Sequence, residues 1–293
     1  MLKLEGVFPA LITPFTKGGK LDEERLRSLV DFVVEGGVAG IVPCGTTGES
    51  ATLSYEEHER VIDIVVDCSK VPVVAGTGSN STREAIELTK YAEDVGADAA
   101  LLITPYYNKP NKRGLIEHFK AVADATELPL VLYNVPSRTG LNMTPDVVAE
   151  LADVPNIVGI KEASGNIGQV AKIIRATRDR DFVVLSGDDA LTFSIMALGG
   201  RGVISVAANI VPKEMNELVA AMLKGDVERA RELHFRLMPL FEAMFLETNP
   251  IPVKKAAELL GLANGTLRLP LAELSEENVK KLRVVLKDLG LLK

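Results

Sequence analysis

The segment Pro155-Asn156-Ile157-Val158-Gly159-Ile160-Lys161-Glu162-Ala163-Ser164-Gly165 places one lysine at the end of a short apolar run. Residues 157–160 do not alternate with polar residues, which is typical of a parallel strand buried on both faces. A lysine at the end of such a strand either snorkels to water or is held in an apolar pocket. There, desolvation lowers its pKa from roughly 10.4 and makes the amine a nucleophile. The alternative is that Lys161 only pairs with Glu162 or another acid.

Further apolar, β-branched runs along the chain bring the number of predicted strands to eight. Helix-period segments separate most of these strands, and two of the segments open with the predicted capping boxes at Ser54 and Ser81. Eight alternating βα units predict an α/β fold, a closed (β/α)8 TIM barrel. The other seven predicted strands are Val7–Ile12, Gly40–Pro43, Val71–Ala75, Ala99–Ile103, Leu130–Tyr133, Phe182–Leu185 and Gly202–Val206.

From Pro212 onward the chain shows only helix patterns, at residues 214–223, 226–245, 253–260 and 275–289. Two prolines between Thr248 and Pro252 fix the backbone, so we expect no regular helix in that connection. A barrel of this class uses about 250 residues, which leaves a remainder at the C-terminus. We therefore expect a barrel catalytic domain over residues 1–224 and a helical domain over residues 225–293.

Composition excludes several classes of function. The 293 residues carry a formal charge of -7 with 5% aromatics and no tryptophan, which argues against a nucleic-acid surface. Cys44 and Cys68 form no CxxC pair, which indicates a reduced intracellular protein. The sequence has no signal-peptide pattern and no apolar run of about 18 residues, so we expect a cytoplasmic protein without a membrane segment. Neither histidine spacing nor glycine motifs indicate a metal or a nucleotide cofactor.

In a barrel the chemistry lies at the C-terminal ends of the strands. The second predicted strand is followed by Cys44-Gly45-Thr46-Thr47-Gly48-Glu49-Ser50, where backbone N–H groups and hydroxyls can converge on a small carboxylate. An ordinary helix-capping turn is the alternative. Tyr106 and Tyr107 follow the fourth predicted strand. A phenol there can act as a proton donor, and the alternative is a packing or subunit contact. Asp188 and Asp189 follow the seventh, where two carboxylates disfavour a phosphate substrate.

Tyr133 ends the strand that precedes the Lys161 strand, so both side chains can face one cavity if both point inward. The same parity groups Ile157, Gly159 and Lys161, with the glycine leaving room below the amine. Arg138 follows a proline that restrains its loop, and a restrained guanidinium suits bidentate binding of a carboxylate. The alternative for Arg138 is an ordinary surface arginine.

Seven motifs together resemble the dihydrodipicolinate synthase (4-hydroxy-tetrahydrodipicolinate synthase) family, which belongs with the pyruvate-dependent class I aldolases and lyases. The resemblance covers essentially the whole chain and implies a TIM-barrel lyase without a cofactor. The motifs are GTTGES (45–50), TPYYNKP (104–110), YNVPSRTG (133–140), GIKEASGN (159–166), LSGDD (185–189), GVISV (202–206) and NPIPVK (249–254).

The resemblance also implies a role for individual residues. Lys161 would form a Schiff base with pyruvate, and Thr47 with its loop backbone would hold the pyruvate carboxylate. A proton relay would comprise Thr46, Tyr133 and Tyr107, the last from a neighbouring subunit of a homotetramer built as a dimer of dimers. Arg138 would bind the carboxylate of aspartate semialdehyde. Gly187 and Ile204 would line the pyruvate site through their backbones.

The implied pathway is lysine biosynthesis through diaminopimelate, and lysine-inhibited members of the family suggest an effector site. Tyr55 stands where many of those members carry histidine, so inhibition stays open. Two rival functions also stay open: a sialic acid lyase or 2-keto-3-deoxy sugar acid aldolase, which Arg138 disfavours, and a catalytically silent barrel that binds a keto acid or amino acid. The residues that match the effector site are Ser50, Ala51, His58, Asn80, Glu84 and Tyr106.

Overall fold

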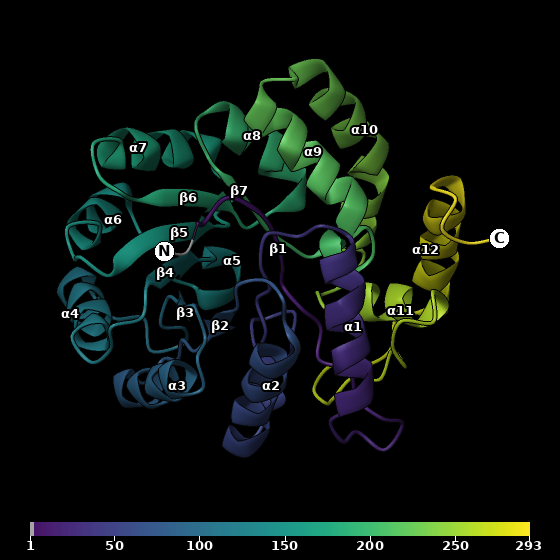
Figure 1. Ribbon diagram of the computed structural model, residues 1–293, viewed down its shortest axis with the longest axis horizontal. Helices are drawn as coiled ribbons and strands as arrows, with labels where there is room; N and C mark the ends of the chain where they lie inside the picture. Colours follow the sequence, from purple (N-terminus) through teal and green to yellow (C-terminus); the bar gives the residue numbers. More distant parts are fainter. Residues whose placement is uncertain (1–2) are drawn as a thin grey trace.

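A parallel β-sheet forms the centre of the protein in the computed structural model, which describes residues 3–293 (Figure 1). Within these residues the sheet has seven strands in the order β1-β7-β6-β5-β4-β3-β2. Neighbours in the sheet are thus consecutive in the chain except at β1 and β7, as repeated βα units require. The strands are β1 Gly6–Pro9, β2 Val74–Gly76, β3 Ala99–Ile103, β4 Leu130–Asn134, β5 Ile157–Glu162, β6 Val183–Ser186 and β7 Gly202–Ser205.

The predicted strand at residues 40–43 is not a continuous strand in the structure. Isolated parallel bridges join Ala10 to Val42 and Ile41 to Val73, so this segment lies between the two outermost strands β1 and β2. Prolines at positions 9, 43 and 72 have no N–H to donate, which limits a regular ladder here.

Helices connect the strands, and Figure 1 shows them arranged around the outside of the sheet. The Ser54 capping box is confirmed, because Ser54 Oγ accepts from Glu57 N at 3.2 Å and Glu57 Oε2 accepts from Ser54 N at 3.1 Å. The second predicted box is wrong in one half. Ser81 caps Glu84 N, but the Glu84 carboxylate accepts from the Ser79 hydroxyl instead. The helices are α1 Glu23–Glu35, α2 Tyr55–Cys68, α3 Thr82–Asp94, α4 Lys112–Ala123, α5 Pro136–Thr139, α6 Pro145–Leu151, α7 Ile167–Thr177, α8 Thr192–Ala197 and α9 Pro212–Lys224.

The apolar core consists of two clusters on opposite faces of the strands. The outer cluster packs the strands against the helices, and the inner cluster contains strand residues such as Phe8, Leu101 and Tyr133. Ile157 belongs to the outer cluster, so the prediction that it shares a face with Lys161 is wrong. The reason is a shift in the pairing of β4 with β5 between Leu130 and Val131, because a shift of one residue reverses which face a side chain occupies.

The chain ends in three helices, α10 Val227–Ala243, α11 Ile251–Leu259 and α12 Glu276–Asp288, which confirms the helix patterns predicted there. In Figure 1 they lie together beside α1 and α9. The prediction that residues 248–252 are non-helical is partly wrong, because α11 begins at Ile251. Pro252 fits in the first turn, where the backbone N–H groups have no intrahelical partner. Within residues 3–293, no helix combines the length and apolar character needed to cross a membrane.

Candidate active site

Lys161 lies at the C-terminal end of β5 and is only 6% exposed. It pairs in register with Tyr133 of β4, and its Nζ lies 4.1 Å from the centroid of the Tyr133 ring. The Tyr133 side chain belongs to the inner cluster, as expected if both side chains point inward. The structure thus brings a buried amine against a phenol ring at the ends of two adjacent strands.

Glu162 is occupied by other partners. Its carboxylate accepts from Asn134 Nδ2 at 3.0 Å and from Ser164 N at 2.9 Å. Burial raises the pKa of this carboxyl, and the hydrogen bonds from Ser164 and Asn134 oppose the rise. Within residues 3–293, Lys161 forms no ion pair with an acidic side chain, so the alternative of a Lys161–Glu162 pair has no support.

The space for the lysine stem comes from Gly187, which follows β6. A Cβ on Gly187 would lie 3.0 Å from Lys161 Cγ and 2.7 Å from Ala163 Cβ. A Cβ on Gly159 would instead meet the carbonyl oxygen of Val183 at 2.6 Å. Gly159 therefore permits a close approach of the β6 backbone, and its role in making room below the amine stays a prediction. Ile204 of β7 is buried in the same inner cluster as Tyr133.

Backbone hydrogen bonds inside the turn at residues 44–50 fix its conformation. The N–H groups of Gly48 and Ser50 donate to the Gly45 carbonyl, and Glu49 N donates to the Thr46 carbonyl at 3.1 Å. These bonds leave the N–H groups of Thr46 and Thr47 as candidate donors to an anion. The buried Thr47 hydroxyl accepts from Asn249 Nδ2 at 3.0 Å.

A cavity of about 540 Å³ opens beside this turn. It is lined by Thr46, Tyr133 and Arg138 from the predicted substrate site. Lys161, Thr47, Gly187 and Ile204 do not line it, and Tyr133 connects the cavity with Lys161. Predicted effector residues line the same cavity, namely Ser50, Ala51, His58, Glu84 and Tyr106.

Two further predicted site residues, Tyr107 and Asn80, do not line the cavity either. Tyr107 is 89% exposed and has a left-handed backbone with φ of 69°. Asn80 accepts a hydrogen bond from Asn108 Nδ2 through its backbone carbonyl at 2.8 Å. Both residues therefore lie in loops beside the cavity lining and do not form part of it.

The effector part of the cavity contains titratable groups with shifted pKa values. Burial lowers the pKa of His58, and its Nε2 donates a hydrogen bond to the Gly76 carbonyl oxygen at 2.7 Å. Burial raises the pKa of the Tyr55 phenol, and Glu84 adds to that rise. Tyr55 also lines the cavity, in the position where the sequence departs from the effector pattern.

Asp189 has a structural task. Its Oδ2 accepts from Val206 N at 3.0 Å and from Ala207 N at 2.8 Å, so it holds the chain that follows β7 and Ile204. Complete burial raises the pKa of this carboxyl to about 6.

Within residues 3–293, no group of three or more His, Cys, Asp or Glu side chains has a geometry that could hold a metal ion.

Sequence reasoning missed Asn249, which joins two parts of the candidate site. Its side chain donates to Thr47, and its backbone carbonyl accepts from Arg138 Nη2 at 3.0 Å. Asn249 is 5% exposed and lines the cavity. The motif match over residues 249–254 was its only signal, because a contact across 202 residues leaves no local pattern.

Comparisons with known proteins show the family of the chain. The model of the dihydrodipicolinate synthetase family matches residues 3–289. The chain is 64% identical over 288 residues to the 4-hydroxy-tetrahydrodipicolinate synthase of Methanosarcina barkeri, covering 98% of this chain and 99% of that one.

Solved structures give the same result. A dihydrodipicolinate synthase from Acinetobacter baumannii, complexed with pyruvate, superposes with a TM-score of 0.97 at 48% identity, covering 99% of this chain and 100% of that one. A homologue from Cyanidioschyzon merolae with lysine bound has a TM-score of 0.95 at 45% identity and covers 98% of this chain and 99% of that one. With a family match over nearly its whole length, the chain belongs to the dihydrodipicolinate synthetase family.

Proposed function

We propose that this protein is a 4-hydroxy-tetrahydrodipicolinate synthase, a lyase that condenses pyruvate with L-aspartate 4-semialdehyde through a Schiff base on Lys161. The reaction belongs to lysine biosynthesis through diaminopimelate. One observation carries the residue assignment: the Lys161 amine is buried, forms no ion pair within residues 3–293, and lies 4.1 Å from the centre of the Tyr133 ring. The pyruvate bound by the Acinetobacter baumannii relative supports the choice of keto acid.

The chemistry follows from an amine and a keto acid. The Lys161 amine adds to the keto carbon of pyruvate, water leaves, and the iminium withdraws electrons so that the methyl group loses a proton. The resulting enamine forms a carbon–carbon bond with the aldehyde carbon, whose oxygen takes up a proton. The amine of the second substrate then displaces Lys161 from the imine carbon and closes a six-membered ring.

Each anionic group has a candidate partner. The pyruvate carboxylate binds Thr47 and the backbone of its turn, and the backbones of Gly187 and Ile204 line the pyruvate site. The burial of Ile204 beside Tyr133 and the contact of Gly187 with the Lys161 stem support this arrangement. Arg138 binds the carboxylate of the semialdehyde, which its place in the cavity lining supports.

Protons are relayed by Thr46, Tyr133 and Tyr107, with Tyr107 contributed by a neighbouring subunit. The high exposure of Tyr107 supports this sharing, because a side chain that is 89% exposed in one chain is free to enter a second chain's cavity. We infer a homotetramer built as a dimer of dimers.

The test of this function is a substrate comparison with the purified protein. Pyruvate with aspartate semialdehyde is expected to give a six-membered cyclic imine with one hydroxyl and two carboxyl groups, detectable by mass spectrometry. Pyruvate with N-acetylmannosamine or a sugar aldehyde is expected to give no product. Faster condensation with a sugar aldehyde would instead identify an aldolase or sialic acid lyase. Absence of turnover with every aldehyde would identify a silent binding protein.

Regulation by lysine is part of the proposal. The effector residues Ser50, Ala51, His58, Glu84 and Tyr106 line the cavity, and Asn80 lies in an adjacent loop. The lysine bound by the Cyanidioschyzon merolae relative supports this ligand. Activity measured against L-lysine is expected to fall, and full activity at millimolar lysine would reject inhibition despite the matching residues.

We also infer that the sheet closes into a (β/α)8 barrel in which residues 40–43 take the place of the second strand. The bridges from Ala10 to Val42 and from Ile41 to Val73 support this closure. The barrel domain then covers residues 1–224, and the C-terminal helical domain covers residues 225–293. The biosynthetic role favours a cytoplasmic location.

A further inference from the structure

The C-terminal part of the chain holds the end of the carboxylate-binding turn through a buried carboxylate. Glu49 Oε1 forms an ion pair with Lys254 Nζ of α11, and both side chains are 1% exposed. Glu49 Oε2 accepts from the backbone N–H of Arg268 at 3.1 Å. Both carboxylate oxygens are therefore bound by residues that lie more than 200 positions further along the chain.

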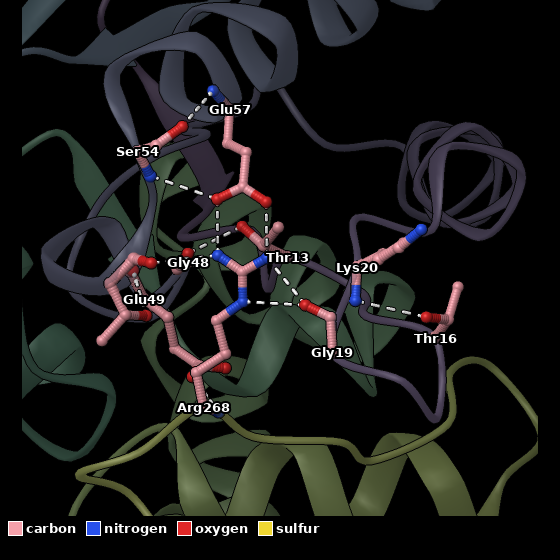
Figure 2. A network of polar contacts seen from close by, with 10 residues as sticks. Thr13, Thr16, Gly19, Lys20, Gly48, Glu49, Ser54, Glu57 and Arg268 are labelled. Carbon is pink, nitrogen blue, oxygen red and sulfur yellow. Dashed lines mark hydrogen bonds and ion pairs between the residues drawn. The ribbon is translucent and has the colours of Figure 1, made fainter.

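Arg268 continues this connection beyond Glu49, as Figure 2 shows. Its guanidinium forms a bidentate pair with Glu57, with both contacts at 2.6 Å, and it donates to the Thr52 carbonyl at 2.9 Å and to the Gly19 carbonyl. The Lys254 and Arg268 cations also lie 4.2 and 4.1 Å from the centre of the Phe15 ring. Lys254 and Arg268 thus contact the segment from Glu49 to Glu57, between the turn and the first residues of α2, at several points.

Glu49 needs such restraint because its backbone is left-handed, with φ of 54°. That conformation costs a non-glycine residue free energy and persists only where surrounding contacts impose it. Its N–H donates to the Thr46 carbonyl, so the orientation of residue 49 is coupled to the peptide between Thr46 and Thr47. A shift of the Glu49 backbone would therefore reorient the peptide that carries the Thr47 N–H.

Stability alone is a weak reason for a buried ion pair. Replacing both charges of such a pair with neutral groups is often harmless to stability, whereas removing one charge leaves the other uncompensated. Burial lowers the pKa of Lys254 to about 8, and Glu49 opposes this shift. Burying the pair therefore costs free energy of desolvation. A role in fixing the geometry of the turn would explain why the pair is present.

We propose that the Glu49–Lys254 ion pair is a positioning element for the substrate carboxylate, which sets the direction of the Thr46 and Thr47 donors. This inference rests on the proposed function, in which that turn binds pyruvate. Neither Glu49 nor Lys254 contacts a reacting atom, so the expected effect is on substrate binding and not on the chemical step. Helix α11 then helps to position the binding site and is not only part of an appendage.

The test separates positioning from stability by comparing Lys254→Met with the double variant Glu49→Gln/Lys254→Met. The single variant is expected to lower the unfolding temperature, and the double variant is expected to recover most of that loss. We expect the KM for pyruvate to stay about tenfold higher in the double variant, because one positioned hydrogen bond to a carboxylate is worth about that factor. The KM for the semialdehyde is expected to change less than twofold.

The matched control is the neutralised pair Lys255→Met/Glu258→Gln, which lies on the same helix but is partly exposed. It is expected to leave the pyruvate KM unchanged. If the double variant at Glu49 and Lys254 is unfolded, Glu49→Asp provides the same test, because it keeps both charges and withdraws the carboxylate by one methylene.

A folded double variant or Glu49→Asp variant with the wild-type pyruvate KM would overturn the positioning role while leaving the proposed function intact. Wild-type protein that fails to condense pyruvate with the semialdehyde would instead refute the proposed function and this inference with it. Borohydride labelling at limiting pyruvate gives a second readout, and reduced labelling in the variants is expected.

Discussion

Replacing Gly187 with alanine tests the position of the Lys161 stem directly. The added Cβ would lie 3.0 Å from Lys161 Cγ and 2.7 Å from Ala163 Cβ, whereas non-bonded carbons rest at about 3.5–4.0 Å. The lysine stem must therefore retreat by roughly 0.5–1 Å. A displacement of about 1 Å at a reacting group lowers a rate by about 100-fold, which is about 3 kcal/mol in the barrier.

The assay follows how fast pyruvate is captured, with borohydride quenching at successive times and mass spectrometry of the whole protein. The unfolding free energy is measured in parallel, because the extra methyl group is expected to cost about 1–3 kcal/mol by overpacking. Gly114→Ala in α4 is the control, since its Cβ would make ordinary contacts at 3.5 Å. A folded Gly187→Ala protein that captures pyruvate at the wild-type rate would refute the argument.

The other predictions concern separate parts of the account. Arg138→Ala should raise the KM for the semialdehyde by about 10- to 100-fold, since a hydrogen bond to a charged group is worth about 1.5–3 kcal/mol. Pyruvate capture should change little. An equal loss in semialdehyde binding and in pyruvate capture would contradict the role of Arg138. Hybrids of Tyr107→Phe and Lys161→Ala chains should partly restore activity, and no rescue after verified subunit mixing would count against a shared tyrosine. Burial lowers the pKa of His118 to about 4, so the folded state excludes a proton that the unfolded state binds below about pH 6.5. Stability should therefore fall by about 2 kcal/mol between pH 7 and pH 5 through this residue, and His118→Gln should show a shallower decline; identical declines in denaturant titrations would contradict this.

Local patterns predicted most of the fold. Ala99–Ile103 was predicted with its observed limits, and the other six strands of the sheet differ from the prediction by one to three residues at an end. The predicted strand Gly40–Pro43 forms only isolated bridges. Apolar runs and helix caps are local consequences of burial and of unsatisfied backbone N–H groups, so they can be recognised without tertiary information. The face assignment of Ile157 failed because the register shift depends on the neighbouring strand.

The candidate site was predicted less completely because several of its contacts join distant parts of the chain. Tyr133 and Lys161 could be placed together, since adjacent strands end at one edge of a parallel sheet. The contacts of Asn249 with Thr47 and of Lys254 with Glu49 span more than 200 residues and have no signature in spacing. Glu49 lies in the turn that the sequence singled out and is buried, but its partners could not be named from the sequence.

The most direct test of the account is reduction with borohydride in the presence of pyruvate, followed by mass mapping of the modified peptide. The chain contains a second buried lysine, Lys254, so the map must resolve which amine reacts. The account predicts a single pyruvate-dependent adduct on Lys161. An unlabelled Lys161, or an adduct found on Lys254 instead, would contradict it.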